Sequence, residues 1–282
     1  MTAGRLILVG TPIGNLGDLS PRARDELARV DVIACEDTRH TGLLLQRSGV
    51  VAKRLLSLHE HNEASRVPQI LSLLDEGRSV AVVSDAGMPC VSDPGARVVA
   101  AAAAAGHTVS VVPGPSAVVA AVVVSGIVDG RFCFEGFLPR RGPERRERLA
   151  AIAGSSAPSV LYEAPRRVAT TLADLAAVCG AERMVAICRE LTKLHEETWR
   201  GSLGQSATRP GADEPRGEYV LVVAERPRPE AATEDEIESA LRDRIANGAD
   251  HRSAVAEVVS ALGASRRDVY AAALRLKSGP LG

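Results

Sequence analysis

Short runs of aliphatic and β-branched residues alternate with helix-like segments over residues 1–126, and this alternation constrains the fold more than any other feature of the sequence. The strand-like runs occupy residues 5–9, 30–35, 54–58, 79–83 and 108–112. A polar loop and then a helical pattern follow each run, as in the alanine-rich residues 96–105. Strands that alternate with helices predict a mostly parallel sheet with helices on both faces.

Polar or glycine-rich loops follow the expected strands at residues 10–18, 36–41, 84–95 and 113–116. Carboxyl ends of parallel strands meet at one edge of a sheet, where ligands bind in open α/β folds. The loop at 84–95 has the backbone most constrained by its sequence, because it carries Asp85, Gly87 and Asp93 together with two prolines. A tight turn with solvated aspartates is the alternative interpretation. The similar character of the other loops favours a ligand-binding cleft.

The first loop does not match the common phosphate-binding signatures. Pro12 stands where a dinucleotide-binding fingerprint would have its second glycine, so an NAD site is disfavoured. The sequence also has no glycine-lysine pair followed by Ser or Thr, which disfavours a P-loop. The ligand of the expected cleft is therefore predicted to be neither NAD nor the phosphates of a nucleotide bound by a P-loop.

Strand and helix signals continue after the first domain, 1–126, and predict a second α/β domain over residues 127–225. Residues 226–282 are expected to form a linker and a tail of three helices. Thr233 and Glu236 have the spacing of a capping box at the start of the first of these helices.

Composition narrows the classes of function. A net charge of -1 gives no general attraction to nucleic acid, so any such contact needs a local basic patch. Aromatic residues make up only 2% of the chain, which argues against a base-stacking platform. The 5 cysteines include no CxxC pair, which disfavours a structural zinc site or a disulfide framework and fits a reducing cytoplasm. No signal peptide is evident, and no apolar stretch reaches the ~20 residues of a membrane span.

Six stretches carry a resemblance to a known family: GTPIGNLGDLS (10–20), EDTRHTGLLL (36–45), SDAGMPCVSDPG (84–95), PGPSA (113–117), FEGFLPR (134–140) and RELTK with its trailing acids (189–197). Together they resemble the tetrapyrrole-methylase family of S-adenosylmethionine-dependent methyltransferases. The branch they match methylates the ribose 2'-oxygen of a cytidine in 16S rRNA. Porphyrin-modifying relatives usually have a VGxGPGD-type first loop and lack the EDTRHT stretch. Met88 and Cys90 depart from the pattern, which has Thr and an aliphatic residue there.

The resemblance implies two α/β domains of the tetrapyrrole-methylase type with the cofactor cleft between them, and a C-terminal helical extension. It also implies S-adenosylmethionine as the cofactor, 16S rRNA in the small ribosomal subunit as the partner, a homodimer and no metal. A cytoplasmic location is expected from the cysteine usage described above.

Cofactor binding is assigned to loop residues that allow close backbone approach or offer a carboxylate. From the first domain these are Pro12, Asp85, Gly87, Met88, Ser116 and Ala117. Tyr162, Gly217 and Glu218 are expected to approach from the second domain. A simple turn is an equally good interpretation of the pair Gly217-Glu218.

Methyl transfer to a ribose hydroxyl requires alignment of donor and acceptor and removal of one proton. Lys193, Glu36 and Asp37 are the favoured catalytic candidates. Lys193 can act as a base if its pKa is lowered, or it can stabilise charge or contact phosphate. Glu36 and Asp37 can equally cap the following helix. His40, His61 and Glu190 are further candidates for the proton transfer.

The arginine run at 140–148 is the best local patch for RNA phosphates, and Arg140, Arg141, Arg145 and Arg146 are its expected contacts. Arg39, Arg166 and Arg167 are expected to extend it. An exposed, glutamate-interleaved helix face is the alternative.

Two other functions compete with RNA methylation. Residues 250–277 have the pattern of a helix-turn-helix, so DNA binding is one rival, although the basic residues lie at the ends of its last helix. A tetrapyrrole C-methyltransferase of the uroporphyrinogen or precorrin type is the other rival. Such an enzyme has no need of the arginine run.

Overall fold

The computed structural model describes residues 4–209, 216–227 and 232–278. The described chain divides into two compact units, Met1–Arg226 and Pro227–Gly282. Residues 228–231 of the expected linker and 279–282 of the expected tail lie outside the described residues.

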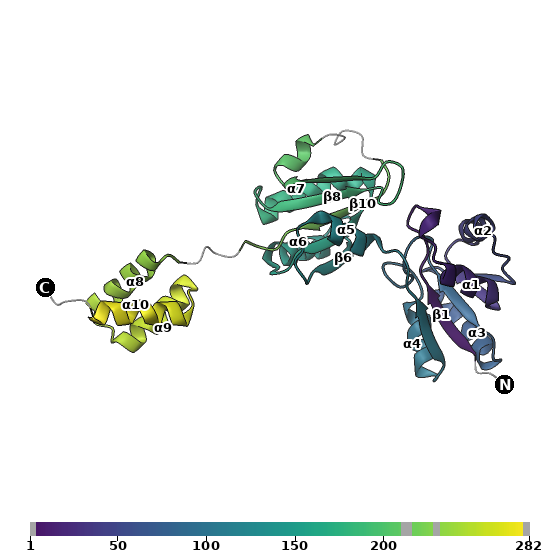
Figure 1. Ribbon diagram of the computed structural model, residues 1–282, viewed down its shortest axis with the longest axis horizontal. Coiled ribbons are helices and arrows are strands. Elements are labelled where there is room, and N and C mark those ends of the chain that lie inside the picture. The colour runs from purple at the N-terminus through teal and green to yellow at the C-terminus, as the bar shows by residue number, and fades with distance from the viewer. Residues whose placement is uncertain (1–3, 210–215, 228–231, 279–282) are drawn as a thin grey trace. The chain divides into compact units, whose positions relative to one another are not determined.

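The first sheet has the order β3-β2-β4-β1-β5, and all of its neighbouring strands are parallel. Its strand β1 is labelled in Figure 1. Its strands are β1 (Arg5–Val9), β2 (Val32–Cys35), β3 (Leu55–Ser57), β4 (Val80–Val83) and β5 (Thr108–Val112). The helices between them are η1 (Leu16–Asp18), α1 (Pro21–Arg29), α2 (Thr38–Arg47), α3 (Glu63–Asp75) and α4 (Ala96–Ala104). The alternation predicted from the sequence is confirmed.

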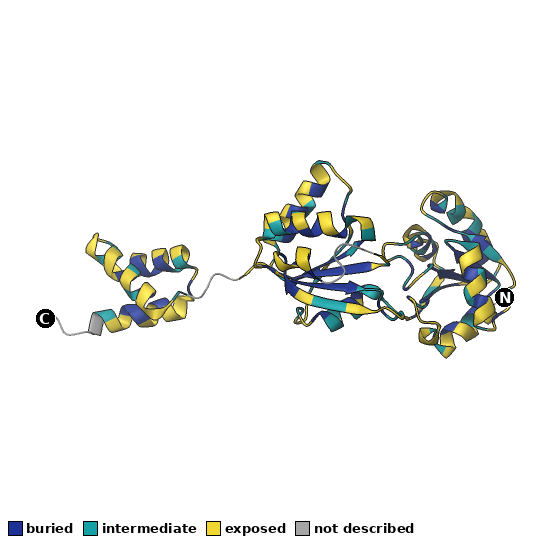
Figure 2. Ribbon diagram, turned by 90° about the horizontal axis from the view of Figure 1, so that it is seen from above, coloured by how far each residue is buried: buried dark blue, intermediate teal, exposed yellow. Residues whose placement is uncertain are grey.

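Helices cover both faces of this sheet. On one face, Ile70 and Leu74 of α3 and Val98 of α4 pack with Leu6 and Val80. On the other face, residues of α1 and α2 such as Leu27 and Leu45 pack with Ile7, Ile33 and Val83. The inner strands β2 and β4 are therefore buried along their whole length, as the dark blue strands in Figure 2 illustrate, which explains why their runs are apolar without alternation.

The second sheet is mixed and has the order β6-β7-β10-β8-β9. Strand β6 is parallel to β7, whereas β10 is antiparallel to both β7 and β8. Its strands are β6 (Cys133–Phe137), β7 (Ser159–Glu163), β8 (Met184–Arg189), β9 (Glu197–Ser202) and β10 (Tyr219–Val223). The other elements are α5 (Ala117–Ser125), α6 (Pro143–Gly154), η2 (Pro165–Arg167), α7 (Val168–Cys179) and η3 (Gln205–Thr208).

Helix α5 packs on the second sheet, although it follows the last strand of the first. Val118 and Ala121 of α5 join Val160, Cys188 and Val222 in one apolar cluster. Helices α6 and α7 cover the opposite face of the same sheet. The chain thus passes from one sheet to the other before α5, earlier than the boundary predicted after residue 126.

The second unit is a bundle of α8 (Glu234–Ala246), α9 (His251–Leu262) and α10 (Arg266–Ser278). Thr233 and Glu236 form the expected capping box at the start of α8. The bundle has its own core, in which Leu241, Val258 and Val269 are fully buried. In the described part of the chain, no helix has the length and apolar character needed to cross a membrane.

Candidate active site

Loops at the carboxyl edge of the first sheet meet as the parallel topology requires. Thr11 and Gly87 form an antiparallel bridge, with a distance of 2.9 Å from the Thr11 amide nitrogen to the Gly87 carbonyl oxygen. A Cβ atom at Gly10 would lie 2.6 Å from the Cα atom of Gly114, so only glycine lets these two loops approach so closely. The first, third and fourth predicted loops are thus joined at one edge.

A cavity of about 410 Å³ lies where these loops face the second sheet. Its volume falls in the range of about 300–1,000 Å³ that is typical of small-molecule sites. Seven of the predicted cofactor-binding residues line it: Gly87, Met88, Ser116, Ala117, Tyr162, Gly217 and Glu218. Residues of both sheets and their loops therefore build a single site within the first unit.

Pro12 and Asp85 are the two predicted cofactor-binding residues outside the lining of this cavity. They line an adjacent hollow of about 150 Å³, together with His40 and Arg47. One Asp85 carboxylate oxygen is 4.0 Å from Nδ1 of His40, and the other accepts a hydrogen bond from the Asp37 amide at 3.3 Å. Asp85 thus ties the loop after β2 to the loop after β4.

Aromatic and aliphatic side chains form the apolar wall of the cavity. The ring of Tyr162 packs against Phe134 and Phe137, with centroid distances of 5.1 and 5.5 Å. Burial raises the pKa of Tyr162 to about 12, and the nearby Asp93 adds to the effect. The phenol is therefore neutral near pH 7 and serves as a wall that carries a hydroxyl group.

Lys193 lies between two carboxylates beside the cavity. Its Nζ atom is 2.9 Å from Glu190 and 3.0 Å from Glu218, and Glu218 lines the cavity. Burial alone would lower the pKa of Lys193, but hydrogen bonds to both carboxylates outweigh it and the pKa is raised. Lys193 is therefore held as a cation, which favours charge stabilisation over the general-base alternative.

Asp37 caps the helix that follows it. Its carboxylate accepts a hydrogen bond of 2.8 Å from the Arg39 amide and forms an ion pair of 2.7 Å with the Arg39 guanidinium. The side-chain hydrogen bond from Arg39 is the largest cause of a strongly lowered pKa at Asp37. This geometry favours the capping alternative for Asp37 over a proton-transfer role.

Glu36 and Asp93 form an acidic region with Asp85. Burial raises the pKa of Glu36, and the charge of Asp85 adds to the effect. Asp93 lines the cavity directly, although the sequence pattern singled out only Asp85 from the same loop as a site residue. Two acids in one loop were visible in the sequence, but which of them faces the cavity depends on the backbone path.

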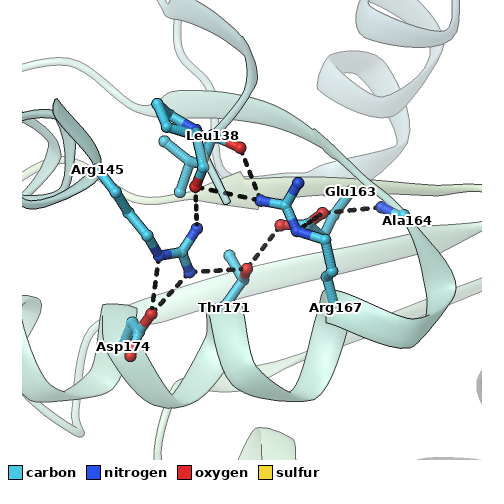
Figure 3. Close-up of polar contacts among 8 residues, drawn as sticks. Leu138, Arg145, Glu163, Ala164, Arg167, Thr171 and Asp174 are labelled. Atoms are coloured by element: carbon cyan, nitrogen blue, oxygen red, sulfur yellow. Dashed lines mark hydrogen bonds and ion pairs between the residues drawn. The ribbon is translucent and has the colours of Figure 1, made fainter. Parts of the chain in front are cut away.

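The prediction that Arg145 contacts RNA phosphates is wrong. The side chain is buried within a polar network of the second sheet and its helices (Figure 3). Its guanidinium donates to Asp174 at 2.6 Å, to the Thr171 hydroxyl at 3.1 Å and to the Pro139 carbonyl at 3.0 Å. The Thr171 hydroxyl in turn donates to Glu163 at 2.6 Å. With these partners, Arg145 is not available to RNA phosphates.

Other members of the predicted patch are exposed: Arg140, Arg141, Arg146 and Arg166. We call these four residues the arginine surface. Arg167 is half-buried and donates to the Leu138 carbonyl at 2.6 Å, which fastens the segment after β6 to η2. Arg39 is exposed but paired with Asp37. Among the described residues, no group of three or more His, Cys, Asp or Glu is arranged to hold a metal ion.

The fold agrees with comparisons to known proteins. Residues 5–207 match the family of Tetrapyrrole (Corrin/Porphyrin) Methylases, and the chain therefore belongs to this family. Ribosomal RNA small subunit methyltransferase I of Synechocystis sp. is 41% identical over 280 residues, which cover 98% of this chain and 99% of that protein. The protein of the same name from Mycobacterium tuberculosis (strain H37Rv) is 43% identical over 98% of this chain and 96% of its own length.

A third relative, named Ribosomal RNA small subunit methyltransferase I, comes from Thermotoga maritima and is 46% identical over 221 residues. The match covers 78% of this chain and 98% of that protein. Among solved structures, the methyltransferase CobJ has a TM-score of 0.59 at 22% identity and covers 80% of this chain and 95% of its own. Uroporphyrin-III C-methyl transferase from Thermus thermophilus, complexed with S-adenyl homocysteine, has a TM-score of 0.56 at 16% identity, covering 78% and 97%. At identities this low, the similarity of the two structures to this chain establishes a shared fold only.

Proposed function

We propose that the protein is an S-adenosylmethionine-dependent methyltransferase that methylates 16S rRNA in the small ribosomal subunit. The observation that carries the proposal is the two-sided cavity in a chain that aligns over nearly its full length with relatives named for rRNA methylation. The finer assignment, to the ribose 2'-oxygen of a cytidine, rests on the sequence motifs that distinguish this branch of the family.

The lining of the cavity fits S-adenosylmethionine. Met88, Tyr162 and Leu191 offer apolar surface for the adenine and the methylene groups of the methionine chain, and the Glu218 carboxylate offers an acceptor for the ammonium group. Gly87 has a φ of +87°, and a Cβ atom there would approach Ile13 within 3.3 Å, so the backbone can line the cavity closely. When bound, this cofactor supplies an electrophilic methyl group.

The arginine surface supports an RNA substrate. Arg140, Arg141 and Arg146 lie between β6 and the first turn of α6, and Phe137 at the end of β6 lines the cavity. Arg166 belongs to η2, whose last residue, Arg167, is hydrogen bonded to the segment after β6. Exposed guanidinium groups next to a cofactor cavity can hold phosphates while a nucleotide enters.

The remaining parts of the proposal concern assembly and location. Helix α5 exposes Val119 and Val123 one turn apart, with 53% and 74% of their surface accessible, which supports a homodimer. A ribosomal substrate supports a cytoplasmic location. DNA binding by the C-terminal bundle is less favoured, because Arg275 of α10 forms ion pairs with Glu234 and Glu238 of α8.

Transfer of a radiolabelled methyl group from S-adenosylmethionine to purified small ribosomal subunits tests the proposal. Nuclease mapping should place the label in a 2'-O-methylcytidine of 16S rRNA. Label on a uroporphyrinoid but not on RNA would replace the substrate and keep the cofactor. Labelled RNA with the methyl group on a base would keep the RNA and overturn the 2'-O assignment.

A further inference from the structure

Asp93 is a carboxylate at the wall of the cavity that has no polar partner among the residues the structure describes. It lines the cavity beside Met88, Ser92 and Tyr162. Within the described ranges, no hydrogen-bond donor and no cation is paired with its side chain, and no such bond contributes to its ionisation. An unpaired carboxylate facing a ligand cavity is available to accept a proton.

The other acidic groups near the cavity are engaged elsewhere. Glu163 is buried and accepts hydrogen bonds from Thr171 and the Ala164 amide. Glu218 is paired with Lys193, and Asp37 is paired with Arg39. Asp85 and Glu36 are not among the residues that line the cavity. Asp93 is therefore the carboxylate best placed for the proton transfer.

Like charges surround Asp93. The groups that face it are Glu36 after β2, Asp85 after β4, Tyr162 of β7 and Cys90 of its own loop. Burial, followed by the charges of Glu36 and Asp85, raises the pKa of Asp93 to about 7. A general base is most effective when its pKa lies near the working pH, because it is then both ionised and sufficiently basic.

The backbone that holds Asp93 is specialised. Cys90 and Ser92 have φ values of 69° and 63°, in the left-handed region that residues other than glycine rarely adopt. Within the described chain, the other non-glycine residues with positive φ are Glu190 and Thr192, beside Lys193. Strained backbone of this kind concentrates at functional sites. Both loops that carry it border the same cavity, through Ser92 and Leu191.

We propose that Asp93 is the catalytic residue that accepts the proton of the ribose hydroxyl during methyl transfer. The proposal rests on the proposed function. The hydroxyl O–H bond breaks and its proton passes to the Asp93 carboxylate, while the oxygen–carbon bond forms and the carbon–sulfur bond breaks. A cationic sulfonium and a carboxylate become a neutral thioether and a carboxylic acid, so charge and atoms balance. Lys193 remains protonated and stabilises the developing alkoxide.

Single-turnover methylation of small ribosomal subunits, measured from about pH 5 to about pH 9, tests this role. The variants are Asp93→Asn, Glu36→Gln and the control Asp129→Asn, in an exposed loop before β6. In the wild type, the rate should rise with pH and level off above a midpoint near the pKa of about 7 at Asp93. Asp93→Asn should lose about 10²- to 10⁴-fold in rate and lose this pH dependence. S-adenosylmethionine affinity, measured by calorimetry, should be retained.

Glu36→Gln should move the midpoint of the rate profile to lower pH, because it removes one repelling charge. The Glu36→Gln variant tests the role of Asp93 even if Asp93→Asn does not fold. A wild-type rate with an unchanged midpoint in Asp93→Asn, or an unchanged midpoint in Glu36→Gln, overturns the proposal and leaves the proposed function intact. Absence of RNA labelling by the wild type at every pH overturns the proposed function itself.

Thermal unfolding gives a readout that needs neither cofactor nor activity. The pKa of Asp93 is about 7 in the folded state, against an ordinary value of 3.8, so the folded state holds more protons between these two pH values. The contribution of Asp93 to stability therefore falls as pH rises through this window. Asp93→Asn should melt at a higher temperature than the wild type above the window, and the gain should shrink below it. A difference in melting temperature between Asp93→Asn and the wild type that does not vary with pH would contradict the raised pKa of Asp93.

Discussion

Replacing Arg145 by Met should destabilise the first unit by about 3 kcal/mol, because Met keeps the aliphatic packing and removes the guanidinium. The change leaves the Pro139 carbonyl and the Asp174 carboxylate without the donors they have at 3.0 and 2.6 Å. Leaving a buried polar group unpaired costs about 1–3 kcal/mol. Water can partly replace the donor to Asp174, because 39% of that side chain is exposed, and Arg167 remains 3.5 Å from the Pro139 carbonyl. The sum therefore lies in the lower half of the range of about 2–6 kcal/mol for two such groups.

Urea denaturation and thermal melting measure this effect, with Arg146→Met as the matched control on the exposed face of the same helix. For a unit of this size, about 3 kcal/mol corresponds to a drop of about 6–12 °C in Tm. Arg146→Met should change stability by less than about 0.5 kcal/mol and should instead reduce the salt dependence of RNA binding. Equal stabilities of the two variants, or a greater reduction of salt dependence for Arg145→Met, would refute the structural role of Arg145.

Three further perturbations test other parts of the site. Lys193→Ala should reduce single-turnover methylation by about 10²-fold with little change in cofactor affinity, since the cation acts on developing charge; near-normal turnover would contradict this role. Gly87→Ala should weaken cofactor binding more than Gly106→Ala, as measured by calorimetry, because both residues have positive φ but only Gly87 borders the cavity. Neutralising the arginine surface with Gln should lower the slope of log affinity against log salt by about 0.7–0.9 for each RNA phosphate that no longer has an arginine partner; an unchanged slope would argue against phosphate binding there.

The first sheet and its loops could be predicted because their signals are local. Each strand is a short apolar run, and parallel pairing brings every carboxyl end to one edge. This rule alone predicts that the loops of Thr11, Gly87 and Gly114 lie close together, and the structure shows that they do. Four predicted residues line the cavity for the same reason, since Gly87, Met88, Ser116 and Ala117 lie in or directly after these loops. The rule does not cover Tyr162, Gly217 and Glu218, which line the cavity from the mixed second sheet.

The features that escaped prediction depend on contacts distant in sequence. Strand β9 carries mixed polar residues at a sheet edge, and its pairing with β8, such as Trp199 opposite Ile187, gives no apolar run. Helix α5 is apolar all around, so its pattern does not reveal which sheet it covers. Arg145 and Arg146 are neighbours of one residue type, and only the partners Asp174 and Thr171 distinguish the buried one.

The C-terminal bundle has a hydrophobic core of its own. Leu241, Val258 and Val269 pack within the bundle, and the apolar clusters of the first unit consist of that unit's own residues. The Thermotoga maritima relative is matched over 98% of its length by only 221 residues, a number close to the 226 of the first unit. Because the bundle has its own core, we expect it to fold as an independent domain and to be exchangeable without loss of the methylase core.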